Sequence, residues 1–121
     1  MRRGEPGRIL EAIWAGDLDL VSSEPLLDEL RQVLAYPKIR KRLDAHRIDV
    51  DLFLDLLPFF VTTVDVENTD VPLPRDADDR VALATLVAAQ ANWLISGDED
   101  LLVLADQFPI IAPAAFVEQY L

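Results

Sequence analysis

The sequence predicts an α/β fold in which a parallel sheet is flanked by helices. Two observations predict it: short apolar runs alternate with segments of helical periodicity, and acidic residues gather where two of these elements begin. Alternation of this kind is typical of parallel sheets, because each parallel strand needs a crossover to reach the next. The 121 residues, about half of them apolar, fit one domain over 1–121 with a single core.

The first half of the chain alternates helix and strand. Apolar residues at helical spacing predict a helix over 6–15, and Gly16-Asp17 breaks the pattern. The apolar segment 18–22 is typical of a buried strand, and Pro25 opens a helix that Tyr36-Pro37 ends. We then expect a basic helical turn to residue 43, a helix over 50–60 and a strand over 61–66.

The second half repeats this alternation after a proline-containing loop over 67–75. A helix over 76–90 is apolar on nearly all sides and must therefore be buried. A strand over 93–96, a short helix over 98–105, a strand at 110–111 and a helix over 113–120 follow. Trp14 and Trp93 stand in apolar runs, which predicts core packing for both.

Composition excludes several classes of site. The chain has no cysteine and one histidine, so disulfides, zinc–thiolate sites and multi-histidine sites are excluded, and any metal needs oxygen ligands. No apolar run reaches the ~18 residues of a membrane span, and the N-terminus lacks a signal-peptide pattern. We therefore expect a cytoplasmic protein with no membrane partner.

The net charge of −11 argues at first against a polyanionic partner, but the charge is unevenly distributed. Five of the eleven basic residues fall in one segment: Lys38, Arg40, Lys41, Arg42 and Arg47. This cluster is either an ordinary solvated surface or an RNA contact, and the sequence favours neither. An acidic protein also suits a basic partner protein.

Three groups of carboxylates are candidates for a site. Glu29 lies about 100° from the middle of the apolar stripe of its helix, at the rim, whereas Asp28 lies about 160° away, in solvent. Asp76, Asp78 and Asp79 precede the buried helix, where one cap explains only one of them and their repulsion suggests a cation or basic partner.

Asp98 and Asp100 follow a predicted strand, at the carboxyl end where open α/β sheets bind ligands. Ser96 and Glu99 have the spacing of a capping box, so helix capping is the alternative interpretation of this cluster. Converging carboxylates are the ligands that Mg²⁺ or Mn²⁺ would take.

These segments resemble a family, the PIN-domain proteins, in particular bacterial toxin components of type II toxin–antitoxin systems. The resemblance covers nearly the whole chain and depends on the order and spacing of segments 7–12, 18–30, 36–39, 75–79, 94–102 and 112–116. It implies a Rossmann-like sheet and a Mg²⁺- or Mn²⁺-dependent endoribonuclease. By position, it implies catalytic roles for Glu29, Asp79 and Asp98, with Asp76, Asp78 and Asp100 as further metal ligands.

The chain departs from this family at its N-terminus. Members begin with a strand that ends in Asp-Thr-Asn and lies centrally, between the strands predicted over 18–22 and 93–96, and no equivalent precedes Gly7. We therefore expect an N-terminally truncated or mis-started PIN domain, whose activity needs the missing aspartate.

Two functions follow from the resemblance. The first is an RNA-cleaving toxin held by a cognate antitoxin. The second is a non-catalytic PIN-like module that docks an antitoxin or a second copy of itself. A phospho-acceptor receiver domain is set aside, because no lysine follows Lys41.

Overall fold

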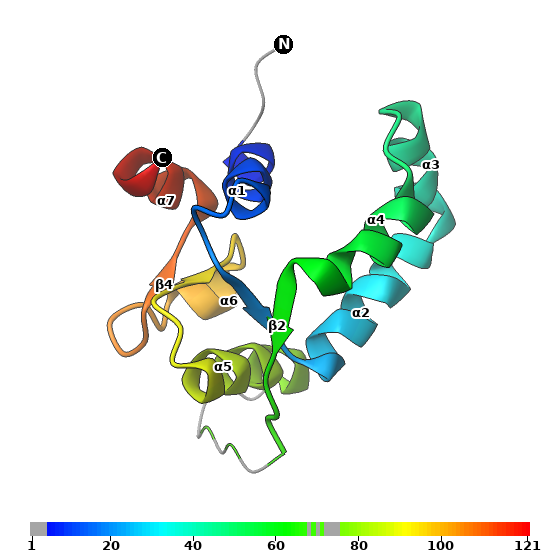
Figure 1. The fold of residues 1–121 in the computed structure, drawn as a ribbon. Coiled ribbons are helices and arrows are strands. Elements are labelled where there is room, and N and C mark those ends of the chain that lie inside the picture. The colour runs from blue at the N-terminus through cyan, green and yellow to red at the C-terminus, as the bar shows by residue number, and fades with distance from the viewer. Residues whose placement is uncertain (1–4, 68, 70, 72–75) are drawn as a thin grey trace.

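The computed structural model describes residues 5–67, 69, 71 and 76–121 (Figure 1). Helices surround short strands, in the chain order α1 (Glu5–Trp14), β1 (Leu20–Ser22), α2 (Glu24–Ala35), α3 (Pro37–Ala45), α4 (Val50–Leu56), the 3-10 helix η1 (Leu57–Phe59), β2 (Val61–Thr63), α5 (Ala77–Ala89), β3 (Leu94–Ile95), α6 (Glu99–Leu102), β4 (Ile110–Ile111) and α7 (Pro113–Tyr120). The predicted alternation of helix and strand is confirmed.

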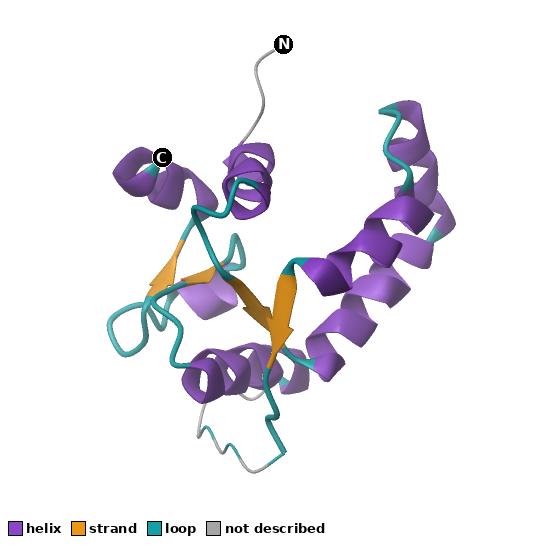
Figure 2. Ribbon diagram, viewed as in Figure 1, coloured by secondary structure: helices purple, strands orange, loops and turns teal. Residues whose placement is uncertain are grey.

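The described strands form two parallel pairs (Figure 2). Leu20 of β1 lies opposite Val61 of β2, and Leu94 of β3 lies opposite Ile110 of β4. Helix α5 contacts both β1 and β3, so the two pairs share one covering helix. Parallel strands between helices confirm the α/β class, but no ladder joins β1 to β3 among the described strands. That interval is where the family resemblance predicts a further strand.

The hydrophobic core is centred on α5. Leu83 is fully buried, and the residues packed around it come from α5 itself, α6, β4 and the segment before α5, namely Val71, Ala82, Leu86, Leu101 and Ile110. The predicted burial of this helix is confirmed, with only Val87 left exposed in its last turns. None of the described helices combines the length and the apolarity needed to cross a bilayer.

Two details differ from the sequence prediction. The helix predicted over 50–60 divides, because Pro58 has no N–H to continue the helical ladder, and η1 replaces its last turn. The prediction of core packing is wrong for Trp14. Its side chain, at the end of α1, is 52% exposed and contacts Phe60, with the ring centroids 6.2 Å apart. Trp93 is half-buried and donates its indole N–H to the Tyr120 hydroxyl at 3.1 Å.

Candidate metal centre

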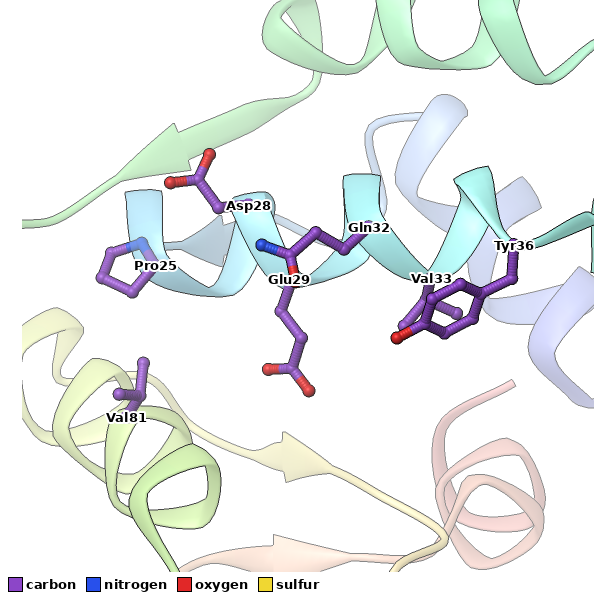
Figure 3. A pocket seen from close by; sticks show the side chains of 7 residues that line it. All are labelled: Pro25, Asp28, Glu29, Gln32, Val33, Tyr36 and Val81. Atoms are coloured by element: carbon purple, nitrogen blue, oxygen red, sulfur yellow. The ribbon is translucent and has the colours of Figure 1, made fainter.

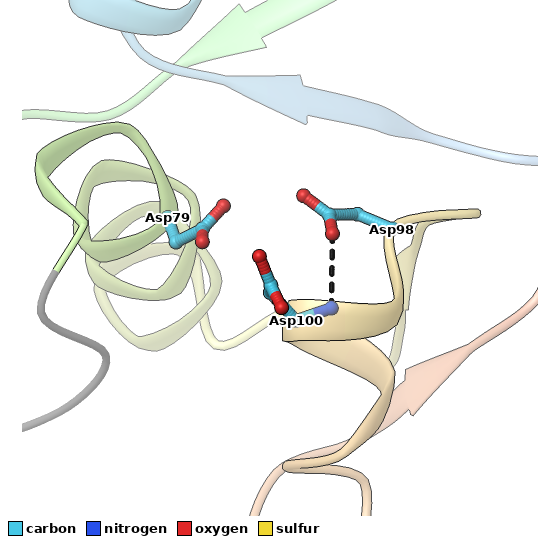
Figure 4. A group of neighbouring side chains, drawn as sticks. All are labelled: Asp79, Asp98 and Asp100. Carbon is cyan, nitrogen blue, oxygen red and sulfur yellow. Dashed lines mark hydrogen bonds between the residues drawn. The ribbon is translucent and has the colours of Figure 1, made fainter.

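Three aspartates from two elements converge at one end of α5 (Figure 4). One carboxylate oxygen from each of Asp79, Asp98 and Asp100 lies within 4.8 Å of the others. Asp79 comes from the first turn of α5, whereas Asp98 and Asp100 belong to the start of α6, just after β3. The cluster is therefore formed jointly by α5 and by the segment that follows β3.

Asp98 is both the N-cap of α6 and a member of this cluster. Its backbone is extended, with φ −78° and ψ 120°, and its carboxylate accepts the Asp100 N–H at 2.9 Å. A carboxylate has two oxygens with about four lone-pair directions, so capping leaves acceptor capacity for a cation. The capping box predicted for Ser96 and Glu99 is wrong, because the Ser96 hydroxyl instead accepts the Asp98 N–H at 3.0 Å.

The aspartates at the start of α5 have different roles. Asp76 accepts the Asp79 N–H at 3.3 Å, which satisfies a first-turn donor of the helix, and it is outside the three-carboxylate group. Asp79 is half-buried and turns toward Asp98 and Asp100 (Figure 4). The Asp78 side chain lies outside the part of the chain that the structure describes.

Glu29 takes its predicted place at the rim of α2, half-buried, while Asp28 is exposed and bonded to Arg31 at 2.8 Å. Glu29 is not within the group formed by Asp79, Asp98 and Asp100. It lines a neighbouring cleft of about 280 Å³ between α2 and α5, together with Val81, two residues beyond Asp79 (Figure 3). Glu29 is thus separate from the cluster, but its cleft reaches α5 close to Asp79.

A buried hydrogen bond that no sequence pattern predicts holds α2 against α5. The hydroxyls of Ser23 and Thr85 lie 2.8 Å apart, and both residues are at most 5% exposed. Because Thr85 donates its own hydrogen to the Val81 carbonyl at 2.7 Å, Ser23 must be the donor in this pair. The bond sits just before α2, so it positions the helix that carries Glu29.

The basic residues for which both a solvated surface and an RNA contact were considered occupy different surfaces. Lys38, Lys41 and Arg42 are exposed on α3, close in sequence to Tyr36 at the end of the cleft. Arg40 pairs with Asp51 of α4 at 2.6 Å, and this hydrogen bond, with the charge of Asp51, raises the pKa of Arg40 above its ordinary value. Arg47 lines a different, apolar groove.

The donor set of the cluster fits a hard divalent cation. Three carboxylates supply only oxygen ligands, the preference of Mg²⁺ and a common choice of Mn²⁺, and the chain offers no thiolate that would select zinc. Three like charges this close also repel one another, and a cation relieves that repulsion. Water and further side chains would have to complete the six ligands of either ion.

Comparison with known proteins finds a family match and a distant relative. The family described as the PIN domain matches residues 1–100 of the chain, a span that includes Glu29 and all three clustered aspartates. An uncharacterized protein of Methanocaldococcus jannaschii is 28% identical over 130 aligned positions, which cover 97% of this chain and 80% of that protein. No solved structure matches the chain.

Proposed function

The chain belongs to the PIN domain family, and from that premise we propose that it is a metal-dependent endoribonuclease. The PIN domain is in general a nuclease fold, so cleavage of a phosphodiester is the coarse function that membership carries. The choice of RNA, the dependence on a metal and a role as the toxin of a toxin–antitoxin pair are the finer parts of the proposal.

One observation carries the metal dependence: carboxylates from two separate elements point to one place. Capping accounts for Asp98 and for Asp76, but the α6 cap does not require the side chain of Asp100. In this proposal Asp79, Asp98 and Asp100 hold Mg²⁺ or Mn²⁺, and Glu29 acts from the adjoining cleft between α2 and α5. The ion, when bound, stabilises charge on the scissile phosphodiester and activates water for its hydrolysis.

The chain's own charge explains why such an ion matters. A protein with a net charge of −11 repels RNA, and the three aspartates concentrate that repulsion where cleavage would occur. A divalent cation held by the three aspartates would offset two of their three negative charges, which weakens the repulsion that an approaching phosphate meets. Lys38, Lys41 and Arg42, exposed on α3, would hold phosphates further along the strand.

Calorimetric titration with Mn²⁺, followed by an RNA cleavage assay, tests this proposal. We expect one site that is lost in Asp98→Asn and in Asp79→Asn, with cleavage lost in parallel. Asp106→Asn is the matched control, because Asp106 is an exposed aspartate outside the cluster, and this variant removes the same charge. Equal Mn²⁺ binding by all four proteins would refute the metal site.

A second function, association with a partner protein, is favoured by an apolar groove of about 270 Å³ between α1 and α4. Its lining includes Trp14 and Leu52, which are 52% and 53% exposed. Asp49 and Arg47 line it, and three further exposed acidic residues adjoin it along the chain, namely Asp17, Asp19 and Asp55. An apolar groove beside acidic side chains suits an amphipathic segment with basic flanks, which is the chemistry we propose for a cognate antitoxin.

Binding of a synthetic amphipathic helix with lysines on its polar face tests the groove. We expect binding that is lost in Leu52→Asp and is weaker for the same helix with glutamates. Sedimentation measures the alternative occupant, a second copy of the chain. Concentration-dependent dimers that Leu52→Asp abolishes would assign the groove to self-association instead.

A further inference from the structure

The cleft that contains Glu29 is lined mainly by one face of α2. Glu29, Gln32, Val33 and Tyr36 recur at positions i, i+3, i+4 and i+7, and seven residues at 100° bring Tyr36 within about 20° of Glu29. Val81 of α5 lies across from them (Figure 3). The volume of about 280 Å³ is near the lower bound of ligand sites, about 300 Å³, so the cleft suits a group the size of a nucleobase.

Two side chains in this cleft have no structural task. Tyr36 is 56% exposed, and Gln32 is also exposed. Within the described residues, neither the Tyr36 hydroxyl nor the Gln32 amide forms a hydrogen bond to the protein. Their aromatic face, donor and acceptors are therefore available to a ligand.

The backbone holds Tyr36 in a fixed position between two helices. It ends α2 and precedes Pro37, with φ −62° and ψ 129°, and its N–H is donated to the Val33 carbonyl at 3.2 Å. Residues before proline are confined to extended backbone, and tyrosine has only two side-chain torsions to order. A ring presented in this way binds a planar ligand at little entropic cost.

We propose that Tyr36 stacks on one unpaired base of the RNA and that Gln32 contacts the edge of that base. This inference rests on the proposed ribonuclease function and requires an unpaired base, because a base within a duplex cannot enter the cleft. Seven helical residues separate Tyr36 from Glu29 by about 10.5 Å along the axis. The stacked base therefore belongs to a nucleotide beside the cleaved one, and Lys38 follows on α3 to meet the next phosphate.

The test uses a short RNA that contains 2-aminopurine, in Mg²⁺ buffer and read by stopped flow before turnover, since the fluorescence of this base falls on stacking. We expect quenching by the wild type and by Tyr36→Phe, which keeps the ring. Tyr36→Leu should lose the quenching and bind roughly ten- to a hundredfold more weakly. In cleavage of unmodified RNA, Tyr36→Leu should raise KM and leave kcat nearly unchanged.

Phe59→Leu is the matched control, because Phe59 is 82% exposed and lies in η1, outside the cleft. Unchanged quenching in Tyr36→Leu, or equal loss in Phe59→Leu, would overturn the inference, and so would absence of quenching in the wild type. The proposed function fails separately, if the wild type cleaves no RNA with Mg²⁺ or Mn²⁺ while Tyr36-dependent quenching remains.

Discussion

Asp98 caps α6 and, in the proposed function, also holds a metal ion, and substitution can separate these two tasks. Asparagine caps a helix about as well as aspartate but carries no charge, whereas alanine does neither. We expect Asp98→Asn to keep the stability of the metal-free protein and to lose Mn²⁺ affinity. Asp98→Ala should lose the affinity and also about 0.5 to 2 kcal/mol of unfolding free energy. Urea unfolding and calorimetry measure the two effects, and Mn²⁺ binding by Asp98→Asn at wild-type affinity would contradict the expectation.

The buried hydrogen bond between Ser23 and Thr85 allows the contribution of one hydroxyl to the unfolding free energy to be measured. Thr85→Val removes the acceptor at nearly constant shape and leaves the Ser23 hydroxyl buried without a partner. An unsatisfied buried polar group costs about 1 to 3 kcal/mol, so we expect a loss of that size in urea unfolding. Adding Ser23→Ala removes the stranded donor, and the double variant should lose less than the sum of the single variants. Additive losses would contradict the hydrogen bond.

At the scale of elements, the end of α1 is set by one backbone conformation. Gly16 has φ +83°, the Gly16 N–H is donated to the Ile13 carbonyl at 3.1 Å, and the Asp17 N–H reaches the Ala12 carbonyl at 2.9 Å. These two bonds form a Schellman motif, whose left-handed residue is usually glycine. The break predicted at Gly16 is confirmed, and the motif supplies its cause.

Replacement of Gly16 and of Gly97 by alanine therefore makes a matched pair that tests this cause. An added Cβ meets nothing within 4 Å at Gly16 or at Gly97, but only Gly16 has a positive φ. Gly16→Ala should cost about 1 to 2 kcal/mol of unfolding free energy, because the left-handed conformation is strained for alanine. Gly97→Ala should change stability by less than about half of that. Thermal unfolding of both variants measures the difference, and equal losses would show that strain is not the cause.

Local sequence patterns predicted the bounds of helices and strands well where a single residue determines the bound. The helix over 113–120 matches α7, because Pro113 fixes its start. Strand lengths were overestimated, since pairing determines them: β2 stops at Thr63, where its partner β1 ends. Core packing of Trp14 was predicted wrongly because an apolar periodicity identifies the apolar face of α1 but not what covers that face.

For the candidate site, too, sequence patterns predicted the local features but not the contacts between distant segments. The angle along α2 placed Glu29 correctly at a rim, and the strand before Asp98 placed that residue near the end of β3. Contacts between distant segments had no local signal. The Ser23–Thr85 bond spans 62 positions, and the pairing of Arg40 with Asp51 spans 11. No local pattern could show which first-turn aspartate of α5 would turn toward α6.

For the whole molecule, charge links metal binding to stability. A net charge of −11 destabilises the compact state through self-repulsion, and any salt relieves part of that repulsion. A specific ion does more, because binding only the folded state adds RT ln(1 + [ion]/Kd), about 2.7 kcal/mol at 100 times Kd. For a chain of this size that stabilisation corresponds to a Tm increase of about 10 °C.

Thermal unfolding in saturating Mn²⁺, compared with NaCl of the same ionic strength, separates the two effects. We expect NaCl to raise Tm by a small amount in the wild type and in the double variant Asp79→Asn/Asp98→Asn alike, since both keep most of their surface charge. Mn²⁺ should add its larger increase only in the wild type, and EDTA should reverse it. If Mn²⁺ and NaCl raised Tm equally, the aspartates near α5 would be helix caps and surface charges, and stability would depend on screening alone.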